Sequence, residues 1–411
     1  MLVLCPSQKT TMNRRNRTVL LSLCFIAFTF AVFRQHAQTS PIMQPPCQCT
    51  SDVNAAESTL NNTTSQQHDV SASVLPPAYT SRNKIVIYTS SRTGSSFTGE
   101  FFQQNSAIHY LFEPLKLLSL ADANYVERHY MQGQIAQYLL DAFNCDYRKL
   151  FRDSYTISPS DNSVRRDWTR RVFAQTVKRH GSRNMSRDFF EETCRRYDTQ
   201  VLKIIRSDHV HSVLPLILDH DVRVLYLLRD PRAKAISRLE IDAQKAKQSL
   251  YEFLSAQTQE RRLLDVARTE CEHLQDTVSF MSHITSSVHQ QKFSRLFRIV
   301  RYEDIAAKPV DMAKKIYAFM NLTYTPEVND WIRKSTTNNK GNLFSTSRDS
   351  KATIEKWRTK LSYELIAQMQ SACQSVLHTF GYKSFASRTE LLNFNSALVL
   401  SPSNTLPYRL H

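Results

Sequence analysis

The sequence predicts an α/β fold, in which helices cover both faces of a mostly parallel sheet, and two segments carry that prediction. Residues 85–88 form a short apolar run that enters a turn of small residues and then a helical stretch over 97–104. Residues 222–228 are apolar at nearly every position, as in a strand buried on both faces of a parallel sheet. Apolar strands keep alternating with helical stretches along the chain, which is typical of this fold class.

Further elements follow the same alternation. Short strands are expected at 201–205 and 297–300, and helices near 134–143, 250–285, 310–320 and 361–377. Ligands of parallel sheets bind outside the carboxyl ends of the strands, so the polar turns after residues 88 and 228 mark the expected site. We find no internal repeat, and we expect a single domain over residues 82–385.

The turn after residue 88 has the composition of a loop that wraps a phosphate. It contains Ser90, Ser91, Arg92, Thr93, Gly94, Ser95 and Ser96 and leads into Phe97. Hydroxyl groups, backbone N–H groups and the positive end of the following helix all suit an anion. Gly94 lets the backbone approach closely, and Arg92 adds a permanent charge. The fold is therefore expected to be P-loop-like, although the loop lacks the second glycine and the lysine of nucleoside triphosphatases.

The second apolar strand ends in another group of polar residues. Arg229 comes first, and Ser237 and Arg238 lie on the helical stretch that follows. Asp230 followed by Pro231 is the pattern of a helix N-cap with proline at the first helical position. Arginines and a serine at the carboxyl end of a sheet strand predict a site for a second phosphate.

The net charge of +16 points to acidic partners, and the N-terminus helps to decide among them. Basic residues precede an apolar run over 19–33. We expect a cytoplasmic tail over 1–18 and an uncleaved transmembrane signal anchor over 19–33, because the flank is basic and the cleavage signal is weak. A cleaved signal peptide is the alternative. Both send the rest of the chain to the secretory lumen, which argues against nucleic acid as a partner.

Composition divides the remainder of the chain. Residues 34–81 are rich in Gln, Ser, Thr, Asn and Pro and predict a disordered luminal stem, whereas 386–411 read as an irregular C-terminal tail. Sequons at Asn61, Asn62, Asn184 and Asn321 agree with a luminal domain.

Beyond the apolar run the chain has six cysteines, at positions 47, 49, 145, 194, 271 and 373. An even number in an oxidising compartment predicts disulfides of unknown connectivity, and Cys47 and Cys49 stand too close to be expected to pair with each other. No Cys/His cluster has ligand spacing, so no metal is expected.

The two polar motifs, together with three shorter ones, resemble those of a known enzyme family. SSRTGSSF over 90–97 and RDPRAxxxSR over 229–238 resemble the 5′-phosphosulfate and 3′-phosphate motifs of Golgi carbohydrate sulfotransferases, which use the sulfate donor PAPS. FEP at 112–114, RYED at 301–304 and STSR at 345–348 followed by WR at 357–358 resemble the branch that sulfates galactose, N-acetylgalactosamine or N-acetylglucosamine at the 6-hydroxyl. The resemblance covers roughly residues 84–358.

The resemblance implies which residues bind the donor. The loop over 90–97 would hold the 5′-phosphate, and Arg229 and Ser237 would hold the 3′-phosphate. Arg348 would add a late nucleotide contact. Trp357 is either a core residue or a contact of the adenine.

The resemblance also implies two catalytic residues. Arg92 would neutralise charge on the departing phosphate, and Glu113 would accept the proton of the acceptor hydroxyl. Glu113 could equally be a structural carboxylate that bonds to nearby backbone. His109 is the alternative base, although a lone histidine is more often structural.

Residues 165–187 carry eight Lys and Arg residues with Trp168 among them. They form either a solvated helix face or a landing surface for an acidic glycan, and the sequence leaves both open.

We expect a single-pass type II Golgi membrane protein whose luminal domain transfers sulfate from PAPS to the 6-hydroxyl of a sugar in a glycan or glycosaminoglycan. The alternatives are a non-catalytic membrane protein that binds acidic glycans and a nucleotide-dependent kinase. The sequence leaves open which sugar is the acceptor and what the oligomeric state is.

Overall fold

The computed structural model describes residues 82–119, 125–151, 163–181, 186–207, 209–254, 257–285, 287–336, 350–400 and 408–410. The predicted tail over 1–18, anchor over 19–33 and stem over 34–81 lie outside these residues. Among the residues that are described, no helix has both the length and the apolar character needed to cross a membrane.

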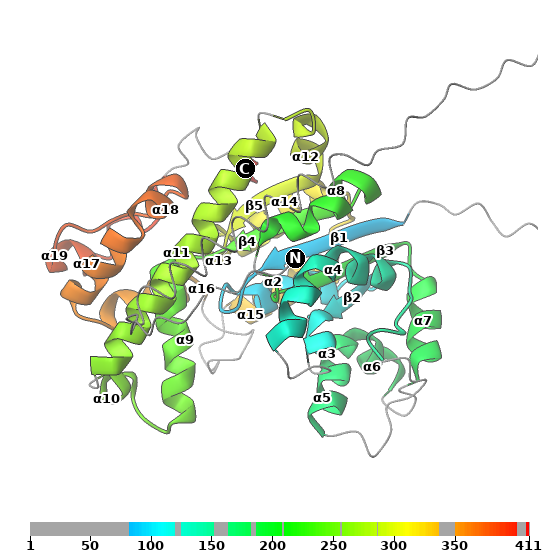
Figure 1. Ribbon diagram of the computed structural model, residues 1–411, viewed down its shortest axis with the longest axis horizontal. Coiled ribbons are helices and arrows are strands. Elements are labelled where there is room, and N and C mark those ends of the chain that lie inside the picture. The colour runs from blue at the N-terminus through cyan, green and yellow to red at the C-terminus, as the bar shows by residue number, and fades with distance from the viewer. Residues whose placement is uncertain are drawn as a thin grey trace, which may run out of the picture. The chain divides into compact units, whose positions relative to one another are not determined.

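A parallel sheet forms the centre of the described domain (Figure 1). Its five strands are β1 (Asn83–Thr89), β2 (Ile108–Phe112), β3 (Thr199–Ile204), β4 (Arg223–Leu228) and β5 (Phe297–Arg301), in the spatial order β2-β3-β1-β4-β5. The predicted α/β fold is confirmed. The edge strand β2 was not predicted, although Ile108, Tyr110, Leu111 and Phe112 are apolar or aromatic.

Helices cover both faces of the sheet, as predicted. The core on one face receives residues from α3 (Leu115–Ser119), α4 (Tyr125–Phe143), α5 (Ser163–Val172), α6 (Ala174–His180), α7 (Arg187–Arg195), η1 (Val210–Val213), α8 (Leu214–His220), α12 (Gln290–Leu296) and α18 (Gln374–Thr379). The other face receives residues from α2 (Ser95–Gln103), α9 (Pro231–Lys245), α10 (Leu250–Leu254), α13 (Tyr302–Ala307), α14 (Pro309–Phe319), α15 (Pro326–Thr336), α16 (Ser350–Glu355), η2 (Lys356–Thr359), α17 (Tyr363–Ala372) and α19 (Arg388–Leu391). The long helix α11 (Gln257–Thr285) contributes to both.

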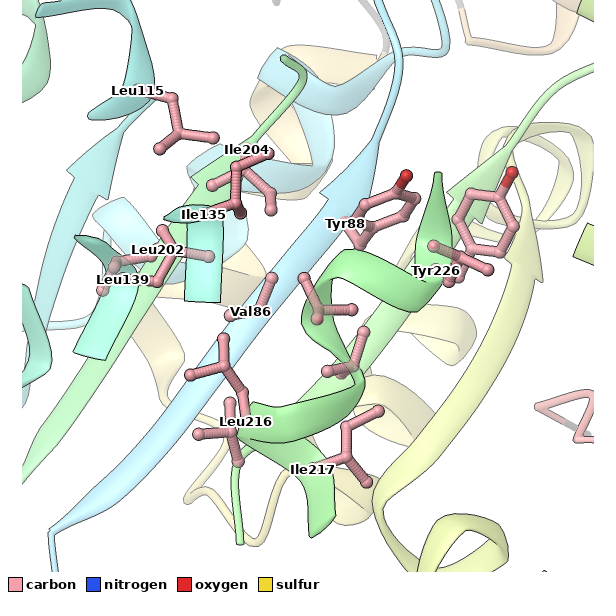
Figure 2. Packing of buried hydrophobic residues seen from close by; sticks show 14 of the residues in the cluster. Val86, Tyr88, Leu115, Ile135, Leu139, Leu202, Ile204, Leu216, Ile217 and Tyr226 are labelled. Atoms are coloured by element: carbon pink, nitrogen blue, oxygen red, sulfur yellow. The ribbon is translucent and has the colours of Figure 1, made fainter. Parts of the chain in front are cut away.

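Alternate residues of the central strand β1 enter the two cores, as the pleat of a strand dictates. Val86 and Tyr88 pack on one face, and Ile85 and Ile87 on the other. Figure 2 shows the first of these cores, where Val86 lies among aliphatic side chains of β3, α4 and α8. Because β1 is buried on both faces and hydrogen-bonded on both edges, the loop that follows it starts from a fixed position.

Three predictions need correction. The helix expected near 361–377 is two helices, α17 and α18, and the one expected over 250–285 is likewise α10 and α11. The segment 386–411 was expected to be irregular, yet it contains α19, and Arg409 bridges to Ile299 of β5. Arg409 also pairs with Asp304, so Arg409 packs on the sheet domain.

Among the described residues, two disulfides cross-link the domain. They confirm the prediction of disulfides that was drawn from the even number of cysteines. Cys145 bonds to Cys194, and Cys271 bonds to Cys373 across 102 residues of sequence. Both bonds are buried, and the second ties α11 to the residue between α17 and α18. Cys47 and Cys49 lie outside the described residues.

Candidate active site

The predicted phosphate loop connects β1 to α2 at the carboxyl end of the sheet (Figure 1). Arg92 and Gly94 adopt positive φ angles of 68° and 82°, so the loop makes a tight turn that is uncommon for an arginine. Gly94 is the N-cap of α2 and supplies no side-chain acceptor to the first turn. The N–H groups at this helix end are therefore oriented to receive an anion.

Threonine side chains hold the loop from inside. Thr93 is 1% exposed, and its Oγ1 lies 2.5 Å from Thr89 Oγ1 and donates to the Ser90 carbonyl over 2.8 Å. Thr89 in turn donates to the Leu227 carbonyl of β4 over 2.8 Å. The Thr93 side chain therefore holds the loop in place. An anion in the loop would bind the backbone N–H group of Thr93 and not its hydroxyl group.

Other predicted loop residues divide in a similar way. The centroid of the Phe97 ring lies 5.2 Å from that of Phe101 and 5.8 Å from that of Trp331, so Phe97 belongs to the core. Ser95 is buried at the start of α2, whereas Ser90, Ser91 and Ser96 are half-buried.

The second predicted motif follows β4 as expected. Asp230 caps α9 by accepting from the Arg232 N–H, with Pro231 in the first turn. The Asp230 carboxylate and the Arg232 guanidinium form a completely buried ion pair of 2.7 Å. Arg232 is thus a structural residue that fixes the start of α9.

Arg229 faces the phosphate loop. Its Nη1 donates to the Arg92 carbonyl over 3.0 Å, and its guanidinium lies 4.8 Å from the centre of the Tyr302 ring. Its Nε is buried and has no hydrogen-bond partner within the described part of the chain. A buried N–H without an acceptor is unfavourable, so this group is suited to an anionic ligand.

The structure brings the two motifs into direct contact. Arg92 Nε and Nη2 both donate to Ser237 Oγ over 3.1 Å. Tyr302 of the RYED motif lies beneath the junction, since a Cβ atom on Gly94 would stand 2.2 Å from its ring. From the sequence, Tyr302 was identified only as part of a family motif. The structure shows that the Tyr302 ring leaves no room for a side chain at position 94.

Glu113 directly follows the edge strand β2, at its carboxyl end, and has a positive φ of 52°. Its two oxygens accept from Lys203 Nζ and Arg206 Nη1, each over 2.7 Å. Burial raises the pKa of Glu113, but the two cations outweigh burial and leave that pKa below its usual value. Glu113 is therefore ionised at neutral pH.

Sequence reasoning missed these two cations. Lys203 is fully buried on β3, and a lysine among the apolar residues over 201–205 was the available sign of a buried ion pair. Arg206 follows the same strand and had no such sign. A third missed cation, Lys234 of α9, is buried between Ser90 and Glu270.

The predicted basic segment lies close to Glu113. Trp168 on α5 is flanked by Lys116 Nζ at 5.6 Å, Arg171 Cζ at 5.3 Å and Arg206 Cζ at 5.6 Å, measured to a ring centroid. Because Arg206 also pairs with Glu113, these cations and the candidate base form one neighbourhood. On the exposed side of α5, Arg170 pairs instead with Asp167 at 3.8 Å.

Of three further candidate residues, one lies outside the described part of the chain and two lie in the core. Arg348 lies outside the described residues. Trp357 is 3% exposed and packs against Phe385, so it is a core residue. His109 is 1% exposed, and its Nε2 lies 3.0 Å from the Tyr147 hydroxyl. Burial lowers the pKa of His109 to about 3, and this neutral core histidine is not suited to act as the alternative base.

Comparison with known proteins identifies the family of this chain. Among solved structures, the mouse sulfotransferase SULT7A1 complexed with PAP aligns with 72% of this chain and 84% of its own, at 10% identity and a TM-score of 0.38. A family model described as Sulfotransferase domain matches residues 82–381.

Curated relatives carry the comparison further. Carbohydrate sulfotransferase 3 of Mus musculus is 30% identical over 347 residues, which cover 77% of this chain and 72% of that protein. Carbohydrate sulfotransferase 1 of Danio rerio is 29% identical over 361 residues, covering 77% of this chain and 82% of that protein. By these sequence matches, the chain belongs to the sulfotransferase family, among the carbohydrate sulfotransferases.

Proposed function

We propose that this protein transfers sulfate from PAPS to the 6-hydroxyl of a galactose, N-acetylgalactosamine or N-acetylglucosamine residue in a glycan of the Golgi lumen. The observation that carries the proposal is the contact between the two phosphate motifs, in which Arg92 of the loop donates to Ser237 of α9. A donor with phosphates at both ends of a ribose needs two such sites side by side.

The residues present fit that donor. The backbone of the loop and the start of α2 would hold the 5′-phosphosulfate, because their N–H groups converge there. Arg229 and Ser237 would hold the 3′-phosphate, and the buried Arg229 Nε supplies an N–H that lacks an acceptor within the described residues. The loop lacks the lysine and the second glycine of nucleoside triphosphatases, which speaks against the kinase alternative.

Sulfate transfer depends on positioning and charge, by analogy with phosphoryl transfer. Arg92 would stabilise the negative charge that grows on the departing phosphate oxygen. Glu113 would accept the hydroxyl proton as the new O–S bond forms. Its pKa is below the usual value, so it is a weak base and would take the proton only as the hydroxyl oxygen loses electron density to sulfur.

The surroundings of Trp168 support the proposal that the acceptor is a glycan. A half-buried tryptophan suits the apolar face of a sugar ring, and the cations Lys116, Arg171 and Arg206 around it suit carboxylate or sulfate groups. This arrangement supports an acidic-glycan contact at Arg171, whereas Arg170 and Arg179 of the same segment make contacts within the protein. The oligomeric state stays open.

The 6-hydroxyl and the Golgi location are supported by sequence features. The FEP, RYED and STSR motifs resemble the branch that sulfates this hydroxyl. The apolar run over 19–33 and the sequons support a type II membrane protein with a luminal domain. The two disulfides agree with an oxidising compartment. Catalysis without a metal remains a prediction.

The test is a transfer assay with the full-length protein purified in detergent from a secretory expression host. Radiolabelled PAPS is offered with chondroitin, keratan and GlcNAc-terminated acceptors, and the labelled sugar and its position are read by digestion and mass spectrometry. Label on a 6-hydroxyl supports the proposal. Glycan binding without transfer, and with no affinity for PAPS, would favour the non-catalytic glycan-binding alternative.

A further inference from the structure

Lys234 is a buried cation for which the phosphate motifs give no reason. It lies on α9, three residues before Ser237, and is 4% exposed. Its ammonium group donates to Ser90 Oγ, at the start of the phosphate loop, and to Glu270 Oε2 on α11. Burying an ammonium group is unfavourable unless its charge is balanced, so this position calls for a function or a strong structural need.

The charge around Lys234 is balanced only in part. Burial lowers the pKa of Lys234, Glu270 raises it, and Arg238 and Arg229 lower it further by repulsion. Lys234, Arg229 and Arg238 therefore place three positive charges near the loop. The ion-pair partner of Lys234 is Glu270. An anion bound in the loop would relieve that repulsion.

Lys234 shares a pocket with the loop. The pocket lies at the carboxyl ends of β1 and β4, and its lining includes Ser90, Thr93, Arg229, Lys234 and Glu270. The side chain therefore meets the loop from the α11 side, in addition to the contacts that Arg229 and Tyr302 make there.

We propose that Lys234 is a positioning residue of the donor site: it fixes the first serine of the phosphate loop and adds positive charge at the loop entrance, with Glu270 as its counter-ion while the donor is absent. This inference rests on the proposed function, because it takes the loop to be the binding site of a phosphosulfate. It predicts that Lys234 and Glu270 affect donor affinity in opposite directions.

The experiment measures the affinity of full-length protein for PAP, the product of the donor, by isothermal titration calorimetry. The main variant is the double substitution Lys234→Met with Glu270→Gln, which removes the charge pair together and leaves no buried charge unpaired. Glu270→Gln alone keeps the lysine and removes its counter-ion. Lys245→Met is the matched control, since Lys245 lies exposed on the same helix beside Asp242.

The double variant is expected to unfold at a temperature close to that of the parent. It is expected to bind PAP about tenfold more weakly than Glu270→Gln, from which it differs only at Lys234, and with a smaller dependence on salt. Glu270→Gln alone leaves the buried Lys234 ammonium group without its carboxylate, so it is expected to unfold at a lower temperature than the parent. It is nevertheless expected to bind PAP about threefold more tightly, because the bound anion then balances the lysine charge. Lys245→Met is expected to match the parent.

Equal PAP affinity in the double variant and in Glu270→Gln, which differ only at Lys234, would overturn the inference and make Lys234 purely structural. Weaker binding by Glu270→Gln would also overturn it. A parent protein that binds no PAP at all would instead contradict the proposed function, so the two failures are distinguishable.

Discussion

Arg92 and Ser237 stand 145 residues apart in the sequence and are joined by two hydrogen bonds, from Nε and Nη2 of the arginine to Oγ of the serine, each over 3.1 Å. The Arg92 carbonyl accepts a further bond from Arg229 over 3.0 Å. One residue of the loop is thus tied to both polar positions of the second motif. The two motifs are therefore tied to each other, and the proposed donor site spans both.

Arg92→Ala is expected to lower kcat by about 10²–10³-fold, because the guanidinium would stabilise charge that develops on the leaving phosphate. Ser237→Ala is expected mainly to raise KM for PAPS, since its partner phosphate is bound equally in the ground state and in the transition state. Initial rates over a PAPS concentration series separate the two effects. An unchanged kcat in Arg92→Ala would show that the arginine is not at the reacting end of the donor.

Gly94→Ala is expected to reduce both stability and donor binding. The new Cβ atom would lie 2.2 Å from the Tyr302 ring, which is buried and cannot withdraw, and φ is +82°. Backbone strain and overpacking together are expected to cost about 2–5 kcal/mol of unfolding free energy, measured by urea denaturation.

Gly181→Ala is the matched control for this substitution. Gly181 has a similar φ of +81°, yet a Cβ atom there would meet nothing within 4 Å. Its ψ of 168° differs from the 11° of Gly94 and is a conformation that nearly requires glycine, so a backbone cost of about 1–3 kcal/mol is expected, without overpacking. Equal losses at the two glycines would show that Tyr302 does not restrict the loop.

The sequence could predict those parts of the site that are formed by residues consecutive in the chain. The loop over 90–97 and the RDPR turn each combine an apolar strand, a polar turn and a helix start, and such local patterns determine local structure. The N-cap at Asp230 and the disulfides followed from equally direct signals.

The remaining parts depend on which strands become neighbours. Glu113 meets Lys203 because β2 pairs with β3, and the Glu113 N–H donates to the Lys203 carbonyl over 2.9 Å. Lys234 meets Glu270 because α9 packs on α11. Neither strand order nor helix packing is encoded in the spacing of these residues, so their pairing could not be predicted from one sequence.

Glu113 is expected to have a structural function and a catalytic one, which a double variant can separate. Glu113→Gln leaves the fully buried Lys203 ammonium without its carboxylate, and is expected to cost about 3–5 kcal/mol of unfolding free energy. Adding Lys203→Met removes that buried charge and is expected to restore most of the stability. Sulfate transfer should stay low in the double variant, because no proton acceptor is present. Transfer that returns together with stability would show that Glu113 only supports the fold.

Glu303 is expected to make the stability of the protein depend on pH. It is 1% exposed, accepts from the Asp230 N–H over 3.0 Å and bonds to the Tyr382 hydroxyl over 3.1 Å. Burial, with a further contribution from Asp230, raises the pKa of Glu303 from 4.5 to about 7. In the folded protein this carboxyl therefore keeps its proton at pH values where the unfolded chain has lost it.

Because the folded pKa is raised, the stabilisation from Glu303 is fully present below pH 4.5 and is lost as pH rises to about 7. The parent is expected to lose about 3 kcal/mol of unfolding free energy over this range relative to Glu303→Gln, which carries no charge at any pH. Urea denaturation of both proteins at several pH values between 4.5 and 7.5 measures the difference. Glu260→Gln, at an exposed position on α11, is the control and should follow the parent. Parallel pH curves for the parent and Glu303→Gln would mean that Glu303 ionises in the folded protein as it does in the unfolded chain.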